Sequence, residues 1–434
     1  MGIVFSIAFL VIITLVVFRP GKLPEGGIAV CGLLVLVALS LLHWGDIPTA
    51  LAGSELMRPL EIVAILISLA VLSMTLDELG FFQYASHRAI LWSQNSGVAL
   101  FRNFFILTVL LTTFTSNDVD VLTMTPIILW FVLETRVDPI PYLVAVFVAA
   151  NTSSMELLIG NLTNIVVGDT FEIGFVRFFV VMIIPTIVTL IAQYAFLRCV
   201  FRKRLRGNLL PSEALAELRQ EVRKPLRNKK QNVFVLSVLA CVIIGSAIAD
   251  VLAFDLWVVT AIGAVVVLVF SKTSLLQRIR SLPWNVVVFV LVFIVLTGKL
   301  DELGVIRYIA SHCAVAFDTF WGAIFTSTMM SAAASGVMNN IPASISVSAV
   351  LSQITAQAPT LLREATAFGT IIGTNLGALI TPVGALATIL WMTLIRANGI
   401  RMPMRTFIAY SASAGLISLV VAATTLGITL LFIV

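Results

Sequence analysis

The sequence predicts an all-α polytopic membrane protein with two inverted repeats of five membrane-spanning helices, each repeat containing a re-entrant hairpin and a broken helix. Three observations predict this fold class. Of the 434 residues, 59% are hydrophobic and only 11% are charged, whereas about 25% of a soluble globular chain is charged. The mean hydropathy is +1.07. Polar residues interrupt the apolar runs at matching places in the two halves of the chain.

Apolar segments long enough to suit membrane crossings follow one another along most of the chain. The first segment lacks a basic start, so we expect a retained helix rather than a cleaved signal. Two amphipathic stretches, 81–92 and 304–316, each lead into a hairpin. We expect ten crossings, at about 2–18, 27–43 and 59–76, a broken crossing that begins at Tyr142, then 175–197, 233–250, 254–271, 283–299, 365–394 (broken) and 406–432, with hairpins at about 98–134 and 319–357.

The two halves repeat with an offset of 224 residues. The motif Leu-Asp-Glu-Leu-Gly occurs at 76–80 and again at 300–304, and Asn151 corresponds to Asn375. Because each half contains an odd number of crossings, the second copy must be inverted. Inverted repeats with broken helices in corresponding positions are typical of secondary transporters, whose binding site lies near the bilayer midplane. We therefore expect a first repeat at 1–200, a basic linker at 201–232 and a second repeat at 233–434.

The basic residues predict the orientation. If the linker, with its helix-forming core from Pro211 to Arg223, is cytoplasmic, 22 of the 27 Lys and Arg residues lie on the cytoplasmic side. Lys and Arg in short loops favour the cytoplasm. Both termini are then expected on the outer face of the inner membrane. The basic residues left on the outer side are Arg58, Arg177, Lys299, Arg307 and Arg363.

The polar run from Thr115 to Asp120 lies between two apolar segments that are short for a crossing. We interpret it as the tip of a re-entrant hairpin rather than an extramembrane turn. Non-helical backbone at membrane depth requires a protein or water-filled surrounding, so the tip is expected to line a cavity.

Two tips and two breaks that converge at midplane would form a site of amides and hydroxyls. No Lys or Arg lies close to these breaks in the sequence. Such a neutral site suits a small polyhydroxylated solute or a desolvated cation, and it suits a dianion poorly. Each Asn taken alone is equally compatible with a helix cap or an interhelical bond. The candidate binding residues are Ser116, Asn117, Asn161, Thr163, Asn164, Asn339, Asn340, Asn375, Thr381 and Thr388.

Carboxylates near the tip and the break are candidates for carrying a proton. Asp118 lies at the first tip and Glu156 lies within the first broken crossing. Burial would favour their neutral form and allow a proton to be carried. Asp120 either shares this position or points to the cytoplasm, while Asp77 and Asp301 end their crossings and are expected to be interfacial caps or anchors.

Several functional classes lack support in the sequence. The four cysteines are widely spaced, so neither a zinc site nor a disulfide framework is expected. The three histidines lie at predicted interfaces without a ligand cluster. No P-loop and no hydrolase motif is present, so we expect neither enzyme activity nor a cofactor. The basic linker needs no nucleic-acid partner, because positive-inside bias explains it.

A set of motifs resembles the ArsB arsenite/antimonite efflux family, within the ion-transporter superfamily that also holds NhaD-type antiporters and dicarboxylate symporters. The match runs nearly end to end. One departure is that Asn151 and Asn375 stand where family members often carry Asp, which leaves Asp118 and Glu156 for the proton. The motifs are Thr115-Ser116-Asn117-Asp118, Thr125-Pro126, Asn161-Leu162-Thr163-Asn164, Met338-Asn339-Asn340-Ile341-Pro342, the run Ile380 to Thr388 and Leu76 to Phe82.

The resemblance implies a scaffold, a mobile transport domain and proton-driven export of neutral arsenite and antimonite trihydroxides. It also implies an ArsA-type ATPase as a partner in some systems. Two other functions stay open. A sodium/proton antiporter also uses Asn-Asp tips, and a passive channel for a small neutral solute would need no proton carrier.

Overall fold

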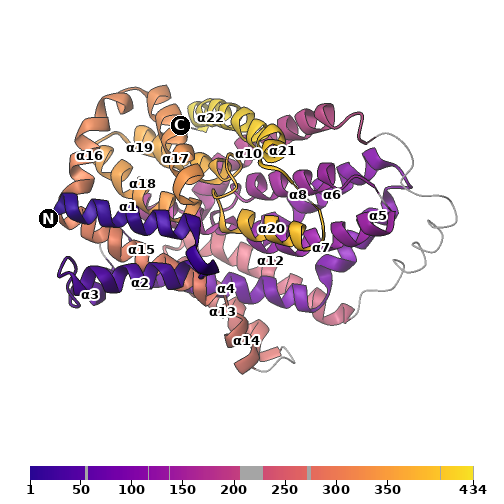
Figure 1. Cartoon of the computed structure of the whole chain (residues 1–434), viewed down its shortest axis with the longest axis horizontal. Helices are drawn as coiled ribbons and strands as arrows, with labels where there is room; N and C mark the ends of the chain where they lie inside the picture. The colour runs from indigo at the N-terminus through magenta and orange to yellow at the C-terminus, as the bar shows by residue number, and fades with distance from the viewer. Residues whose placement is uncertain are drawn as a thin grey trace.

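The computed structural model describes residues 1–53, 57–115, 117–135, 137–205, 228–270, 275–400 and 402–433. Within these ranges, the side chains at positions 22, 114, 118, 119, 132–135, 275, 276, 386 and 387 lie outside the description. All described elements are helices (Figure 1). The first half contains α1 (Gly2–Phe18), α2 (Glu25–Ala38), α3 (Asp46–Ala52), α4 (Pro59–Glu78), α5 (Phe81–Trp92), α6 (Gly97–Phe114), α7 (Asn117–Thr135), α8 (Ile140–Ser153), α9 (Leu162–Phe171) and α10 (Phe175–Val200).

The second half repeats this order of helices. It contains α12 (Lys229–Val251), α13 (Leu256–Phe270), α14 (Leu275–Ser281), α15 (Trp284–Glu302), α16 (Val305–Cys313), α17 (Phe320–Met338), α18 (Asn340–Ile354), α19 (Thr360–Gly377), α20 (Leu386–Ala397), α21 (Met404–Phe407) and α22 (Ser413–Ile433).

The predicted hairpins and breaks are present as helical features. Helices α6 and α7 form the first hairpin, α17 and α18 form the second, and each broken crossing divides into two helices, α8 with α9 and α19 with α20. The short connecting helices α3 and α14 are additional elements. The predicted helix from Pro211 to Arg223 lies outside the described residues.

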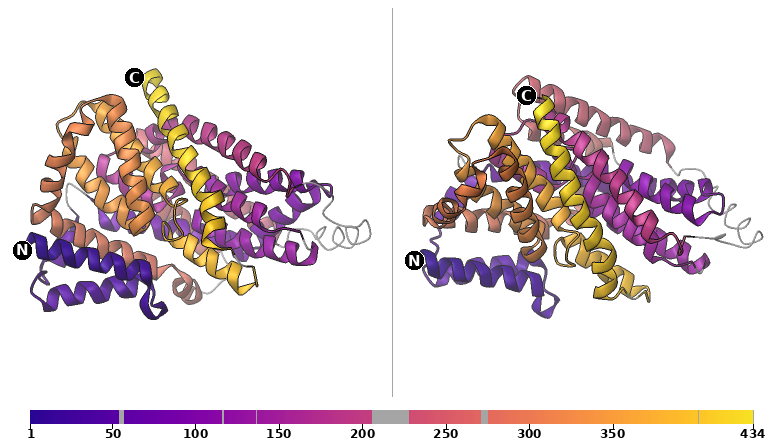
Figure 2. Two further views of the ribbon diagram at one scale, coloured as in Figure 1. Left: turned by 45° about the horizontal axis from the view of Figure 1, so that its top comes forward. Right: turned by 90° about the horizontal axis from the view of Figure 1, so that it is seen from above.

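The repeats pack in a crosswise manner. Helix α2 packs on α15 while its counterpart α13 packs on α4, and α7 packs on α20 while α18 packs on α9. Equivalent helices α10 and α22 pack on each other, and α22 runs between the orange α17 and the purple α10 (Figure 2). Such reciprocal pairs are what a pseudo-two-fold relation between the halves produces.

The broken crossings occupy the centre of the molecule. Every residue from Pro141 to Ser153 of α8 is buried, and so is every residue from Ala365 to Gly377 of α19. Phe147 of α8 stacks on Trp391 of α20 with ring centroids 4.6 Å apart. The polar breaks are therefore enclosed by protein, as non-helical backbone in a membrane protein requires.

The repeated Leu-Asp-Glu-Leu-Gly motif forms equivalent corners in the two halves. Gly80 and Gly304 have φ values of 73° and 75°, a region in which glycine carries no steric penalty, and each turns the chain into the next helix. The glutamates then pair with basic residues, Glu78 with Arg278 at 3.0 Å and Glu302 with Lys299 at 2.9 Å. The conserved spacing between the halves thus reflects a structural corner.

The aspartates of the same motif contact the hairpins. Asp77 lies close to the Thr123 hydroxyl of α7. Asp301 accepts a hydrogen bond of 2.5 Å from Gln353 Nε2 of α18. Each of these aspartates therefore contacts the hairpin of its own half as well as lying at the end of a helix.

Five described helices are long and apolar enough to cross a membrane: Pro59–Glu78, Phe175–Val200, Lys229–Val251, Trp284–Glu302 and Met404–Ile433. Shorter apolar helices of 10–17 residues, such as α1, α2 and α13, lie at several of the other predicted crossings. The count of ten crossings stays a prediction.

Long-range ion pairs agree with the predicted two sides. On the predicted outer side, Arg58 pairs with Asp169, Arg177 with Glu364 and Lys299 with Asp46. On the predicted cytoplasmic side, Arg204 pairs with Asp138 and Arg278 with Glu78. Figure 1 shows the N-terminus at the left end and α5, which the count places on the cytoplasmic side, at the right end.

Candidate functional site

The first hairpin tip is held by side-chain contacts at the start of α7. Asn117 Nδ2 donates a hydrogen bond of 3.3 Å to Asn151 Oδ1 of α8. Thr115 Oγ1, just before the tip, donates a bond of 2.8 Å to Asp120 Oδ1. Ser116 and the side chain of Asp118, two of the predicted site residues, lie outside the described residues.

The first break is a short 3₁₀ turn, Leu158–Gly160, between α8 and α9. Asn161 caps α9, since its Oδ1 accepts a bond of 3.3 Å from Thr163 N. Asn164 Nδ2 donates to the Ser154 and Leu157 carbonyls at 2.8 and 2.9 Å, which satisfies carbonyls freed by the end of α8.

The chain folds back tightly at both breaks. A Cβ atom on Gly160 would lie 2.4 Å from the Ser154 carbonyl oxygen. A Cβ atom on the equivalent Gly384 would lie 2.8 Å from Ala378 Cα. Only glycine permits such a close approach of two backbone segments, which explains the matching glycines.

An amide cluster joins the two halves at the first break. Asn375 Oδ1 of α19 accepts a bond of 2.7 Å from Asn161 Nδ2, and Asn375 Nδ2 donates a bond of 2.8 Å to Asn164 Oδ1. Ser154 Oγ lies 3.1 Å from both Asn375 Oδ1 and the Asn151 carbonyl. The cluster therefore links the first tip, the first break and the second half through buried hydrogen bonds.

The second tip contacts the second break. Asn340 N donates a bond of 2.9 Å to the Gly384 carbonyl, and Thr381 Oγ1 donates a bond of 2.5 Å to the Gly336 carbonyl. Asn339 has φ 79° and ψ 149°, a conformation essentially restricted to glycine. Its Oδ1 accepts a bond of 3.1 Å from Ile341 N, which caps α18.

Two of the predicted site residues are buried threonines without a hydrogen-bond partner for the hydroxyl. The hydroxyls of Thr163 and Thr388 are fully buried and make no hydrogen bond among the described residues. Thr388 occupies the position equivalent to Asn164, on the opposite side of the repeat. Buried hydroxyls without partners are uncommon in folded proteins, and they are available to an incoming ligand.

The buried carboxylates near the first tip and the first break, Asp120 and Glu156, have no basic partner among the described residues. Asp120 is fully buried, which corrects the alternative that it points to the cytoplasm. Glu156 is 6% exposed and is close to the Thr113 hydroxyl. Among the described contacts of the site amides and hydroxyls, none involves Lys or Arg.

Two contributors to the site, Asn151 and Ser154, are absent from the predicted binding residues. Their side chains bridge the tip to the amide cluster. Both belong to the polar run from 151 to 154 within an apolar segment, which was a signal for them, and Asn151 also corresponds to Asn375. Asp120, which was an alternative proton carrier, lies behind the tip.

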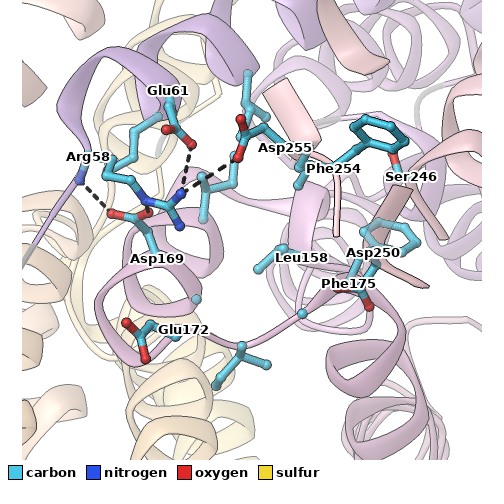
Figure 3. A pocket seen from close by; sticks show the side chains of 17 residues that line it. Arg58, Glu61, Leu158, Asp169, Glu172, Phe175, Ser246, Asp250, Phe254 and Asp255 are labelled. Carbon is cyan, nitrogen blue, oxygen red and sulfur yellow. Dashed lines mark hydrogen bonds and ion pairs between the residues drawn. The ribbon is translucent and has the colours of Figure 1, made fainter. Parts of the chain in front are cut away.

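A separate cavity of about 210 Å³ lies near the predicted outer face (Figure 3). Arg58, at the start of α4, contacts Asp169 of α9 at 3.0 Å and Glu61 at 3.3 Å, and lies 3.8 Å from Asp255. Asp250 Oδ2, at the end of α12, accepts a bond of 2.8 Å from Val176 N of α10. These contacts connect α4 with α9 of the broken crossing and α12 with α10, and they lie away from the amide cluster.

Helical hairpins, central broken helices and a buried polar cluster define a membrane transporter, and comparison with solved structures agrees. The crystal structure described as that of the Alcanivorax borkumensis YdaH transporter has a similar fold, with a TM-score of 0.54 and 12% sequence identity, over 98% of this chain and 97% of that chain. The chain belongs to the CitMHS family, described as citrate transporters, whose model matches residues 7–373.

The chain is also similar to arsenical pump membrane proteins. One from Escherichia coli is 29% identical over 394 residues, covering 88% of this chain and 89% of the relative. A putative arsenical pump membrane protein from Bacillus subtilis is 27% identical, covering 90% of this chain and 91% of the relative. These relatives confirm the resemblance to the ArsB family, and the chain is an integral multi-pass transporter rather than an enzyme.

Proposed function

We propose that this transporter exports arsenite and antimonite from the cytoplasm, as neutral trihydroxides, in exchange for protons. The observation that carries the proposal is the chemistry of the central cluster. Amides and hydroxyls from both halves are buried there, and none of their described contacts involves a cation.

A neutral polyhydroxylated cargo fits such a cluster. A trihydroxide offers three donors and several acceptors, which pair with amides and with hydroxyls such as those of Thr163 and Thr388. Citrate, the substrate in the family description, carries several negative charges, and burying them requires basic partners. The similarity to arsenical pumps favours the neutral cargo.

The energy source follows from the charge of the cargo. A neutral solute gains nothing from the membrane potential, so uphill export needs a coupled ion. One charge crossing 100 mV supplies about 2.3 kcal/mol, which sustains a gradient of roughly fifty-fold. Asp118 and Glu156 are the proton carriers named by the sequence interpretation.

The location and partners belong to the same proposal. The chain resides in the inner membrane with residues 201–232 in the cytoplasm and both termini outside, as the distribution of basic residues favours. An ArsA-type ATPase is a candidate partner of the cytoplasmic surface.

Transport assays in everted membrane vesicles test this function. Vesicles with an acidic lumen should accumulate arsenite and antimonite but not citrate, and sodium should not replace the proton gradient. Accumulation of citrate, or accumulation that requires sodium, contradicts the proposal. Equilibration that never exceeds the outside concentration indicates a channel instead.

A further inference from the structure

We propose that Asp120 and Asp77 form the proton-carrying pair of this transporter, with Asp120 as the buried carrier and Asp77 as its opening to the cytoplasm. This inference rests on the proposed proton exchange and adds residues to it. Both are first-half carboxylates, on α7 and α4 respectively, which pack on each other.

The surroundings of Asp120 suit a group that binds and releases a proton. Its carboxylate is fully buried, and Oδ1 accepts a hydrogen bond of 2.8 Å from the Thr115 hydroxyl. The Thr112 hydroxyl lies close to the carboxylate, but Oδ2 makes no hydrogen bond of standard geometry among the described residues. An ionised carboxylate away from water without a cation is strongly disfavoured. The free oxygen leaves room for the proton of the neutral form.

Asp77 provides a route between this carboxylate and water. The Asp77 side chain is exposed at the end of α4, and it interacts electrostatically with Asp120. Thr123, which lies close to Asp77, comes three residues after Asp120 and is therefore on the same face of α7. The three side chains are progressively less exposed. Asp77 of α4 is exposed, Thr123 of α7 is half-buried and Asp120 of α7 is fully buried.

The charged and titratable side chains on the other helices packed against α7 have described contacts with groups other than Asp120. The His87 ring of α5 lies beside the Trp130 ring in a tilted arrangement, with centroids 5.6 Å apart. Arg88 of the same helix donates a hydrogen bond of 3.0 Å to Tyr84 Oη. Arg102 of α6 bonds Asn103, and Tyr142 of α8 donates to the Gly97 carbonyl at 3.4 Å. The charged group of α20, Arg396, is exposed near the end of that helix.

The second half lacks this arrangement. The position equivalent to Asp120 is Ser344, and the equivalent of Asp77, Asp301, bonds the uncharged Gln353. The proton route is therefore specific to the first half, whose hairpin enters from the cytoplasmic side in the predicted orientation. A proton taken up on the Asp120 carboxylate when the tip faces outward forms an O–H bond. That bond breaks on transfer to the Asp77 carboxylate, which releases the proton to cytoplasmic water.

Everted vesicles carrying Asp120→Asn test this proposal in two assays. Arsenite accumulation driven by an acidic lumen should fall at least tenfold. Arsenite counterflow, with arsenite on both sides and no proton gradient, should stay within about twofold of wild type, since it needs binding and movement but no net proton transfer. Asp120→Glu should restore driven accumulation, and Asp77→Asn should slow it and flatten its pH profile.

Matched variants separate this inference from its alternatives. Asp301→Asn should retain proton-driven accumulation. If Asp120→Asn keeps full accumulation and pH dependence while Asp118→Asn or Glu156→Gln loses them, the assignment to Asp120 is wrong. Loss of counterflow in a folded Asp120→Asn protein shows a structural role only. Wild-type vesicles that ignore the proton gradient overturn the proposed exchange itself, and this inference with it.

Discussion

Asn375 joins the second half to the first within the amide cluster. Its side chain donates to Asn164 and the Ile371 carbonyl, and accepts from Asn161. Asn375→Ala leaves buried amides without partners, at about 1–3 kcal/mol for each unsatisfied group. We expect a lower melting temperature in detergent. Asn398→Ala, an exposed residue that bonds only the Leu394 carbonyl among described contacts, is the control and should leave the melting temperature unchanged.

Asn117 is expected to act on binding rather than on coupling. Truncation of Asn117 to Ala removes the bond to Asn151 at the tip and leaves that amide without its partner. Arsenite affinity should fall by roughly tenfold, corresponding to about 1.4 kcal/mol. Counterflow measured over a range of arsenite concentrations reports this change, and unchanged half-saturation would exclude Asn117 from the site.

The cysteines are expected to be dispensable. Trivalent arsenic binds thiols tightly, but an exporter must release its cargo, which hydrogen bonds permit. Cys31, Cys199 and Cys241 lie on exposed helix surfaces and Cys313 is half-buried on α16, all outside the tips and breaks. A protein with all four replaced by Ala or Ser should keep near-normal export. Loss of export in that folded protein would show that a thiol binds the cargo.

At the scale of elements, an ion pair holds the start of α3 against the end of α15. Asp46 of α3 lies 2.9 Å from Lys299 Nζ, which also contacts Glu302. The backbone N–H of His43 and the Lys299 ammonium lower the pKa of Asp46. Because the folded-state pKa lies below the unfolded value of about 3.9, Asp46 stabilises the protein above that pH.

The Asp46–Lys299 ion pair predicts a contribution to the free energy of unfolding that is lost in acid. The stabilisation by Asp46 is lost as the pH falls below about 4 and through the folded-state pKa. Asp46→Asn should therefore lower stability at pH 6 and have little effect at pH 3. Unfolding curves at both pH values check this, with the exposed Asp318→Asn as the control. An equal loss at both pH values would contradict the electrostatic explanation.

The elements themselves were largely predictable from the sequence. Polar residues within apolar runs, such as Asn161 and Asn339, marked the breaks and tips, because backbone groups must be satisfied wherever a helix is interrupted. Pairing was not predictable. The bonds from Asn375 to Asn161, the burial of Asp120 and the contacts of Arg58 all depend on how distant helices pack, for which local pattern carries no signal.

At the scale of the whole molecule, the aspartate of the repeated Leu-Asp-Glu-Leu-Gly motif contacts the two hairpins at different positions along their second helices, α7 and α18. Asp77 contacts α7 at Thr123, whereas Asp301 contacts α18 at Gln353. With the offset of 224 residues, Thr123 corresponds to position 347, six residues before Gln353. Six helical residues span about 9 Å. The hairpins are therefore displaced toward the predicted cytoplasmic side.

This asymmetry predicts a second state with exchanged registers, in which Asp77 lies beside Leu129. In a cysteine-free background, the pair Asp77→Cys and Thr123→Cys should cross-link readily and block transport. Cross-linking of Asp77→Cys with Leu129→Cys should require turnover conditions. Full transport by the first cross-linked pair would show that the hairpin does not slide.

In the proposed function, a neutral arsenic trihydroxide crosses the membrane through the polar cluster, whose described contacts include no Lys or Arg. Protons cross in the opposite direction. Uptake of arsenite into everted vesicles under an imposed proton gradient, with and without sodium, tests it most directly. We predict accumulation in an acidic lumen that collapses when the gradient is dissipated and does not change with sodium. Equal arsenite inside and outside under every gradient, or accumulation that follows sodium alone, would contradict the account.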